Sequence, residues 1–371
     1  MKFTISKDKL NSLVQKVLNI VPVRSTLPVL SNILLEADKD KVKMRATDLD
    51  VAITSELEAD IKNKGSLTVP GRMFADLIRE LPEGDVVITG VDKRIEVKSE
   101  RGLYKIAGIS ADEFPRFPKI DFTDEVKIDT DVIKGMISKS IFAVSRDETR
   151  PALNGILWKC EEGLLTMVAT NGHILAKVEQ SGLDVKGIEK GVIVPPKALE
   201  YFSKLSVDAP DEIGLVFAAD NLVLNLDNTI LTTRLIDGPY PNFEQVIPKE
   251  HSKRAVFDKD EFLALVRRVS ILSNNITHQI KLVFGAESIE AMATNYDIGG
   301  EGRDEIAMDY QGEELEIGYN ANYLLEIMKH VETDQAVMEF TTGTAAAVID
   351  SISHPENQDY CFLIMPLRLA E

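Results

Sequence analysis

Positively charged side chains recur at fixed intervals in three short segments of the sequence. The intervals are 125 residues long, and in two of the segments both places hold a cation. Lysine and arginine in this pattern favour contact with phosphate groups, which gives affinity without reading a base sequence. The repeated cations therefore predict a surface that contacts a nucleic-acid backbone. The three pairs of places are Arg72 and Arg79, Lys197 and Lys204, and Asn322 and Lys329.

The same segments have the apolar period of an amphipathic helix. At about 100° per residue, Arg72 and Arg79 fall on one side of the predicted helix, and Phe74 and Ile78 fall on the other. We call these cations, which lie opposite the apolar side of each predicted helix, the stripe. In a single helix, ordinary exposure to solvent would explain such a stripe, but its recurrence in three helices favours a shared function. Cations near a second set of predicted helices fit the same surface less cleanly: Lys9, Lys16, Lys134, Lys139, Arg267 and Arg268.

The long period also predicts the architecture. A chain of 371 residues exceeds one ordinary core, and a period of about 125 residues matches the usual size of a domain. We expect three similar domains of α+β class, each with two helices packed on antiparallel sheets. The predicted boundaries are residues 1–122, 126–248 and 249–371, with linkers near 119–125 and 248–254.

A further helix pattern opens each predicted domain. Its apolar positions are three and four residues apart, as a buried helix face requires. A carboxylate can accept the unpaired amides of the first turn, and the candidates are Asp131, and Asp258 or Asp260. The apolar positions are Leu10, Leu13, Val14 and Val17; Ile133, Met136, Ile137 and Ile141; and Phe262, Leu265, Val266 and Val269.

The net charge of −18 argues against a general nucleic-acid binder. Screening limits the reach of each charge to about 8–10 Å, so an acidic protein can still carry one basic surface. Cys160 and Cys361 lie in apolar stretches and are expected to be buried free thiols. Without an apolar run of about 18 residues or an apolar signal at its start, the chain is expected to be cytoplasmic and not membrane-bound.

Catalytic motifs are missing from the sequence. It has no GxxxxGK[ST] phosphate loop, HExxH, GxSxG or CxxC. The histidines lack the spacing of a metal site, so neither a metal nor another cofactor is expected. One rival hypothesis is a hydrolase built around Thr170 and His173. Another is a three-domain scaffold that binds proteins without encircling DNA.

Five segments carry a family resemblance over the whole chain: residues 1–4, 24–32, 150–155, 169–173 and 365–369. In this order they resemble the bacterial DNA polymerase III beta subunit, the replicative sliding clamp. The resemblance implies a non-catalytic protein in which two subunits close head to tail into a ring of six domains. Helices line the hole and sheets form the outside. Because such a ring holds duplex DNA topologically, it needs only weak phosphate contacts while it keeps the polymerase processive.

The resemblance also implies which residues contact DNA, with Arg24 and Arg72 the strongest candidates. A loop that carries two tyrosines in the family holds Pro151 and Ala152 here, which removes the groups that would stack on DNA. Together with the repeated stripe, the resemblance gives a predicted set of Arg24, Arg72, Arg79, Arg146, Lys197 and Lys204.

By the same resemblance, short linear motifs of partner proteins dock between the second and third domains. The implied partners are the polymerase alpha subunit, the clamp loader, other polymerases and mismatch repair proteins. Apolar side chains there can hold aliphatic or aromatic anchors, and polar ones can orient the peptide. Ile174 and Gln245 replace common arginines, and Ala346 replaces a hydroxyl, so apolar peptide contacts are expected to gain weight. The matching positions are Thr170, Gly172, His173, Leu175, Pro241, Val246, Asn320, Tyr323, Met365, Pro366, Leu367 and Arg368.

The ring implied by the family joins the first domain of one subunit to the third domain of the other. Two edge strands that pair across subunits would remove exposed edges. Ile271 and Leu272 are expected to meet Tyr104 and Ile106 of the partner subunit, although without the family an intramolecular core position explains them equally well. The predicted interface residues are Arg101, Tyr104, Ile106, Ile271, Leu272, Glu301, Asp304 and Glu305.

Overall fold

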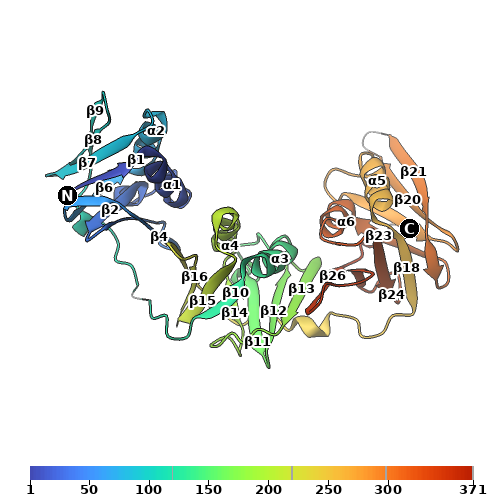
Figure 1. Ribbon diagram of the computed structural model, residues 1–371. Coiled ribbons are helices and arrows are strands. Elements are labelled where there is room, and N and C mark those ends of the chain that lie inside the picture. Colours follow the sequence, from blue (N-terminus) through green and yellow to red (C-terminus); the bar gives the residue numbers. More distant parts are fainter. Residues whose placement is uncertain (119, 219, 297–298, 370–371) are drawn as a thin grey trace. The chain divides into compact units, whose positions relative to one another are not determined.

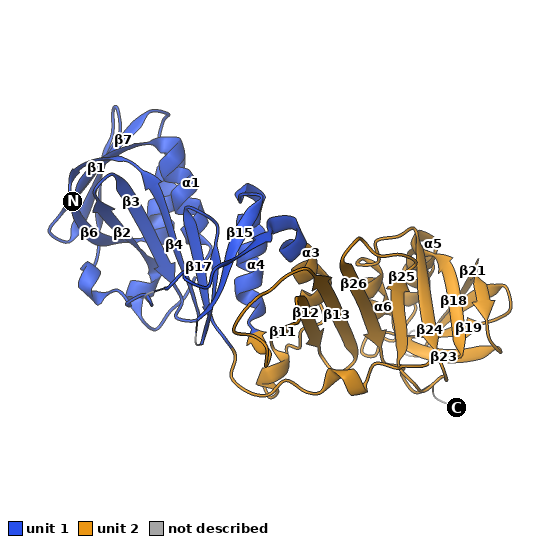
Figure 2. Ribbon diagram, turned by 60° about the horizontal axis from the view of Figure 1, so that its bottom comes forward, with its two compact units in different colours: residues 1–134, 194–235 blue, residues 135–193, 236–371 orange. Residues whose placement is uncertain are grey.

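The computed structural model describes residues 1–118, 120–218, 220–296 and 299–369. The chain forms two compact units (Figure 2). Unit 1 comprises residues 1–134 and 194–235, and unit 2 comprises residues 135–193 and 236–371. The helix α3 (Thr130–Ile141) and the strand β14 (Val192–Val194) each cross this division.

Unit 1 contains two antiparallel sheets with helices packed on them (Figure 1). One sheet has the order β5-β1-β7-β8-β9, and the other has the order β10-β15-β16-β17-β4-β3-β2-β6. Helices α1 and α2 pack together, and α1 lies against β3 and β4. The elements are β1 (Lys2–Ser6), α1 (Lys7–Leu18), β2 (Asn32–Asp38), β3 (Lys41–Thr47), β4 (Val51–Glu58), β5 (Asp60–Asn63), β6 (Gly65–Pro70), α2 (Gly71–Glu80), β7 (Asp85–Val91), β8 (Arg94–Lys98), β9 (Leu103–Ala107), β10 (Val126–Asp129), α4 (Pro196–Leu205), β15 (Glu212–Ala218), β16 (Asn221–Asn225) and β17 (Thr229–Arg234).

Unit 2 is built in the same way. Its larger sheet has the order β14-β11-β12-β13-β26-β25-β24-β18-β22, and its smaller sheet has the order β21-β20-β19-β23. Helices α5 and α6 pack together, and α5 lies on β20 and β21. The elements are β11 (Ile156–Glu161), β12 (Leu164–Thr170), β13 (Ile174–Ser181), β18 (Lys253–Asp258), α5 (Lys259–Ser270), β19 (Gln279–Phe284), β20 (Ser288–Asn295), β21 (Gly300–Ala307), β22 (Asp309–Gln311), β23 (Leu315–Asn320), α6 (Ala321–Met328), β24 (Gln335–Phe340), β25 (Ala347–Ser351) and β26 (Gln358–Ile364).

Strands of neighbouring repeats share these large sheets. In unit 1, β4 pairs with β17, so that Ile53 lies opposite Leu231. In unit 2, β13 pairs with β26, so that Leu175 lies opposite Leu363. The strands themselves were predictable, but this pairing was not, because an alternating pattern does not specify which neighbour a strand selects.

The helices predicted from apolar periodicity are confirmed. In α2, Phe74 and Ile78 are buried while Arg72 and Arg79 are exposed. The predicted apolar faces of α1, α3 and α5 are buried as well, except that Ile141 at the end of α3 is only partly covered. The cations of the stripe therefore point away from the core, as their spacing predicts.

One of the predicted helix caps is wrong. Asp131 lies inside α3, and the cap is Asp129, whose Oδ1 accepts the amides of Asp131 and Val132 at 2.9 and 3.0 Å. Asp258 is confirmed, because its carboxylate accepts the Glu261 amide at 2.9 Å. Both carboxylates satisfy amides that the first helical turn leaves unpaired.

The connections between repeats follow the predicted linkers with one change. Residues 120–125 are free of helix and strand, whereas residue 119 lies outside the described residues. The second linker is shorter than predicted, because Lys253 already begins β18 and lies opposite Phe340 of β24.

Candidate DNA-facing and peptide-binding sites

The arginines predicted to contact DNA differ in whether a carboxylate already neutralises their charge. Arg24, Arg72 and Arg146 are exposed and form no ion pair within the described part of the chain. Arg79, in contrast, lies 2.6 Å from the carboxylate of Asp76. A guanidinium already neutralised by a carboxylate has less positive charge to offer a phosphate, so Arg24, Arg72 and Arg146 carry more free charge than Arg79.

The two lysines of α4 also differ. The Lys197 ammonium donates to Asp48, which follows β3. Desolvation lowers the pKa of Lys197, but the hydrogen bond and the charge of Asp48 outweigh it, so this pKa is raised. Lys204 instead lies over the Tyr201 ring, 5.7 Å from its centroid.

The third copy of the stripe carries the least free positive charge. Helix α6 ends at Met328, so Lys329 is its C-cap, and its ammonium lies 2.5 Å from Glu326. Asn322 is exposed where the other two repeats have a cation. The third repeat therefore offers little attraction for phosphate.

Two of the additional cations do not belong to a basic surface, contrary to prediction. The buried Lys139 ammonium lies 2.7 Å from Glu332 and 2.9 Å from Gln358 Oε1. The Arg268 guanidinium lies 2.6 Å from Asp304. The positive charge of Lys139 is buried and that of Arg268 is neutralised by Asp304, so both have less charge to offer DNA.

The predicted peptide-binding residues converge on one turn in unit 2. Thr170 Oγ1 donates to the Ile174 carbonyl at 2.7 Å and accepts the Gly172 amide at 3.1 Å. Asn171 Oδ1 accepts the amides of His173 and Ile174 at 2.9 and 3.0 Å. Gly172 has a φ of 89°, a left-handed conformation that glycine adopts without strain. These bonds hold the exposed His173 in place.

The C-terminal segment closes against this turn. The Met365 amide donates to the His173 carbonyl at 2.8 Å, and the Leu367 amide donates to the Gly318 carbonyl at 2.7 Å. Pro366 between them is partly buried, and Arg368 beyond them is exposed. The backbone is thus fixed on two sides, which holds the 41% exposed side chain of Met365 at the surface.

Polar and aromatic groups from α6 border the same surface. The rings of His173 and Tyr323 stack with centroids 5.8 Å apart. Asn320 caps α6 by accepting the Asn322 amide at 2.9 Å, and its amide group donates to the Thr277 carbonyl at 2.9 Å. These groups can orient a bound peptide, because their own positions are set by the helix start.

A buried apolar cluster forms the floor of this surface. It lies on one face of the nine-stranded sheet, and Tyr240 and Phe243 pack against it. Leu175 was predicted as a direct anchor contact, but its side chain is 3% exposed and belongs to the floor. Pro241 and Val246, from the connection that crosses this face, are exposed and remain available. The cluster consists of Leu157, Val168, Leu175, Ala346, Val348 and Leu363.

The three departures from the family pattern have different consequences. Ile174 is buried in the sheet opposite Ile364, so its side chain adds no exposed apolar group for a peptide. Ala346 belongs to the apolar floor. Gln245 is exposed. The expected gain in weight of apolar peptide contacts stays a prediction.

Models of one protein family match nearly the whole chain. The N-terminal, central and C-terminal domain models of the DNA polymerase III beta subunit match residues 1–118, 127–242 and 244–368. The chain belongs to the DNA polymerase III beta subunit family.

Named relatives and known structures agree with this assignment. The beta sliding clamps of Bacillus subtilis and Caulobacter vibrioides are 31% and 32% identical to the chain, over at least 99% of the chain and all of each relative. The crystal structure of the DNA polymerase III subunit beta from Pseudomonas aeruginosa is 28% identical, covers both chains fully and superposes with a TM-score of 0.94.

A beta subunit is a sliding clamp, a non-catalytic protein that encircles duplex DNA and keeps the replicative polymerase bound to it, and this is the function of the chain. The hydrolase and scaffold hypotheses are therefore wrong. Cys160 and Cys361 are free thiols, Cys160 buried and Cys361 partly covered. Among the described residues, no helix is long and apolar enough to cross a membrane.

The interface predicted for the clamp ring involves two free sheet edges. β9 is an outer strand of the five-stranded sheet in unit 1, and β21 is an outer strand of the four-stranded sheet in unit 2. Tyr104 on β9 is exposed, and Ile271 after α5 is 76% exposed. An unpaired strand beside an exposed apolar residue favours pairing with another chain.

Some interface predictions need revision. Ile106 is buried within its own unit and offers no side chain to a partner. Leu272 is partly buried and lies against Gly302, and Asp304 already pairs with Arg268. The remaining predicted charges, Arg101, Glu301 and Glu305, are exposed.

Proposed function

We propose that Arg24, Arg72 and Arg146 make the main contacts of this clamp with duplex DNA, and that Arg79, Lys197 and Lys204 contribute less. The observation that carries the proposal is that these three arginines are exposed and form no ion pair with a described residue, although the chain as a whole has a net charge of −18. Contacts of this kind are weak, salt-sensitive and independent of base sequence, so a clamp held topologically can slide.

We also assign the surface around His173, Tyr323 and Met365 to short linear motifs of partner proteins. Its apolar floor, exposed Met365 and exposed Val246 can receive an apolar anchor, and His173 can orient it. The partners proposed are the polymerase alpha subunit, the clamp loader, other polymerases and mismatch repair proteins, all in the cytoplasm. The three domains proposed for the chain are residues 1–122, 126–248 and 249–371.

Ring closure is proposed to pair β9 of one subunit with β21 of its partner. Ile271 provides the exposed apolar contact beside Tyr104, and Arg101 faces Glu301 and Glu305 of the partner subunit. Because each copy contributes both edges, two copies form two identical junctions and close the ring.

Replacing Arg24 and Arg72 together with alanine is expected to weaken DNA binding and its salt dependence. Each lost phosphate contact lowers the slope of log K against log salt by about 0.9. The measurement is fluorescence anisotropy with a labelled duplex between about 50 and 200 mM salt. Arg79→Ala should change the slope less, and Arg254→Ala, on β18, should leave it unaltered. An unaltered slope in the double variant would remove these arginines from the DNA surface.

A further inference from the structure

The turn that positions His173 is repeated in unit 1. Thr47 Oγ1 donates to the Val51 carbonyl at 2.9 Å and accepts the Leu49 amide at 3.0 Å. Asp48 Oδ1 accepts the amides of Asp50 and Val51 at 3.1 and 2.8 Å. These bonds match, one for one, those made by the turn of residues 170–174.

A short aromatic segment that lies beside each turn is repeated too. Residues 114–117 read Phe-Pro-Arg-Phe, and residues 240–243 read Tyr-Pro-Asn-Phe. In unit 2, Tyr240 and Phe243 pack on the apolar floor. In unit 1, Phe117 stacks with Phe114 and receives the Arg45 guanidinium 5.1 Å from its ring centroid. Both segments therefore border a sheet face beside the same kind of turn.

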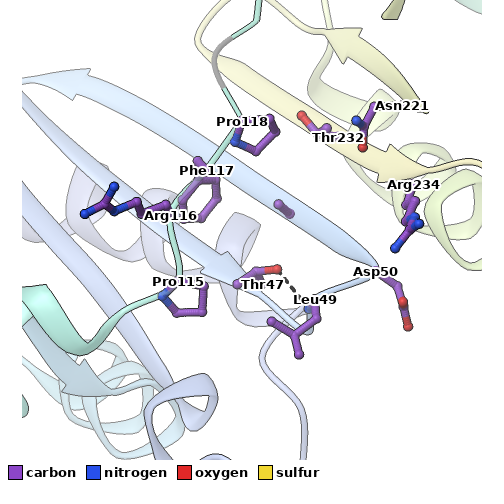
Figure 3. A pocket seen from close by; sticks show the side chains of 11 residues that line it. Thr47, Leu49, Asp50, Pro115, Arg116, Phe117, Pro118, Asn221, Thr232 and Arg234 are labelled. Atoms are coloured by element: carbon purple, nitrogen blue, oxygen red, sulfur yellow. Dashed lines mark hydrogen bonds between the residues drawn. The ribbon is translucent and has the colours of Figure 1, made fainter. Parts of the chain in front are cut away.

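The segment of unit 1 borders a groove. Figure 3 shows Pro115, Phe117 and Pro118 along one wall, with Thr232, Asn221 and Arg234 on strands of the sheet across from them. This hollow has a volume of about 140 Å³. A second hollow of about 370 Å³ adjoins it, and Ala52, Phe117, Pro118 and Thr232 line both. We call the first hollow the Leu49 groove; its lining residues are Thr47, Leu49, Asp50, Ala52, Pro115, Arg116, Phe117, Pro118, Asn221, Thr232 and Arg234.

Leu49 is an unusual residue for its position. Its φ is 84°, a left-handed conformation that hinders a side chain with Cβ, whereas the equivalent residue of the other turn is Gly172. Its side chain is 58% exposed, so burial in the core does not explain why leucine stands there. Strained backbone of this kind gathers at binding sites, where a displayed side chain offsets its cost.

The charges of the Leu49 groove favour an acidic ligand. Arg116 and Arg234 form no ion pair with any described residue, whereas nearby Arg45 is paired with Glu36 at 3.1 Å. Asp50 is the single carboxylate in the lining. Figure 3 shows the two arginines on different sides of the groove, with the Arg116 side chain directed away from Leu49 and Asp50, so each unpaired guanidinium can receive a carboxylate next to the apolar lining by itself. A nucleic-acid backbone would gain nothing from Leu49 or Pro115, whereas an apolar peptide side chain can pack on both.

We propose that the Leu49 groove is a second docking site for extended peptide segments that carry an acidic side chain beside an aliphatic or aromatic one. The proposal rests on the peptide-binding role assigned above to the His173 surface, of which this groove is the repeat equivalent. A clamp with both sites can hold two different partner segments on one subunit.

The test uses the full-length chain with Met365→Ala and Leu367→Ala, which disables the His173 surface. A phage-displayed library of random seven-residue peptides is selected against this protein, and enriched peptides are measured by fluorescence anisotropy. We expect enriched sequences to pair Asp or Glu with Leu or Phe. Adding Arg116→Gln and Arg234→Gln should weaken them by roughly tenfold or more, because each charge-assisted contact is lost.

Leu49→Gly separates docking from folding. It should weaken the same peptides by roughly fivefold, while its melting temperature stays equal or rises because the turn is relieved of strain. Arg254→Gln, a control at a partly exposed arginine on β18 that pairs with Glu339, should leave affinity unaltered. No enrichment, or peptides insensitive to the arginine and Leu49 variants, would overturn the proposal. A second selection uses the unmodified chain. Peptides that bind the unmodified chain but not the Met365 and Leu367 variant report on the His173 surface, so failure of that proposed site can be told apart from failure of the Leu49 groove.

Discussion

Replacing Ile271 and Leu272 together with alanine is expected to convert the dimeric clamp into monomers. Ile271 is 76% exposed and follows α5, the helix that packs on β21, and the Leu272 side chain lies against Gly302 of β21. Truncating an apolar anchor at the centre of an interface costs about 2 kcal/mol or more, and each ring has two such junctions. Multi-angle light scattering should report a mass near 41.1 kDa instead of twice that value.

The matched control for this interface is Val207→Ala. Val207 has the same 76% exposure but lies in the short helix after α4 and belongs to neither edge strand, so its variant should stay dimeric. The melting temperature of the Ile271 and Leu272 variant separates dissociation from unfolding. Dimers that persist in a folded double variant would show that β9 and β21 do not close the ring.

Disabling the His173 surface is expected to remove polymerase tethering while leaving the ring intact. Met365→Ala with Leu367→Ala takes away apolar contacts whose backbone is fixed at 2.8 and 2.7 Å to the carbonyls of His173 and Gly318. Loss of two anchor side chains should weaken a polymerase-derived peptide by roughly 30-fold or more. In primer extension on a circular template, products should shorten to those made by the polymerase alone.

A control of similar exposure is Ile352→Ala. Its side chain, after β25, is 47% exposed against 41% for Met365, but it is not among the residues around the turn of His173. Full-length extension products and unaltered mass are expected for this variant. Long products from the Met365 and Leu367 variant would mean that the polymerase is held elsewhere on the clamp.

Local periodicity was sufficient to predict much of this fold. The helical spacing of Phe74 and Ile78 opposite Arg72 depends only on the geometry of one helix, and the recurrence of that pattern identified the repeats. The family resemblance, in contrast, identified Thr170, Gly172 and His173, and the structure shows that they form one local turn. These features required no knowledge of which strand pairs with which.

Long-range pairing accounts for what the sequence did not reveal. Leu363 reaches Leu175 only because β26 joins β13, so the apolar floor combines residues nearly two hundred positions apart. Lys139 has the spacing of a surface cation but meets Glu332 and Gln358 from a distant segment. Ile106 sits on an edge strand, yet its side chain faces inward.

Divergence between the repeats was visible in the sequence, but its meaning was not. Leu49 stands where the equivalent turn has Gly172, and only the backbone angles of 84° and 89° reveal that both residues share one strained conformation. Likewise, Arg116 stands where the other segment has Asn242, and only the structure shows that it lines the same groove as Arg234.

The most direct test of the central claim is release of the clamp from linearised DNA. The protein is loaded by its clamp loader onto a nicked circular duplex, separated from free protein, and the DNA is then cut once. Because a closed ring is held topologically and its arginines bind phosphate only weakly, the protein should slide off the ends and leave the DNA fraction. Retention on linear DNA at physiological salt would contradict encirclement and indicate direct binding.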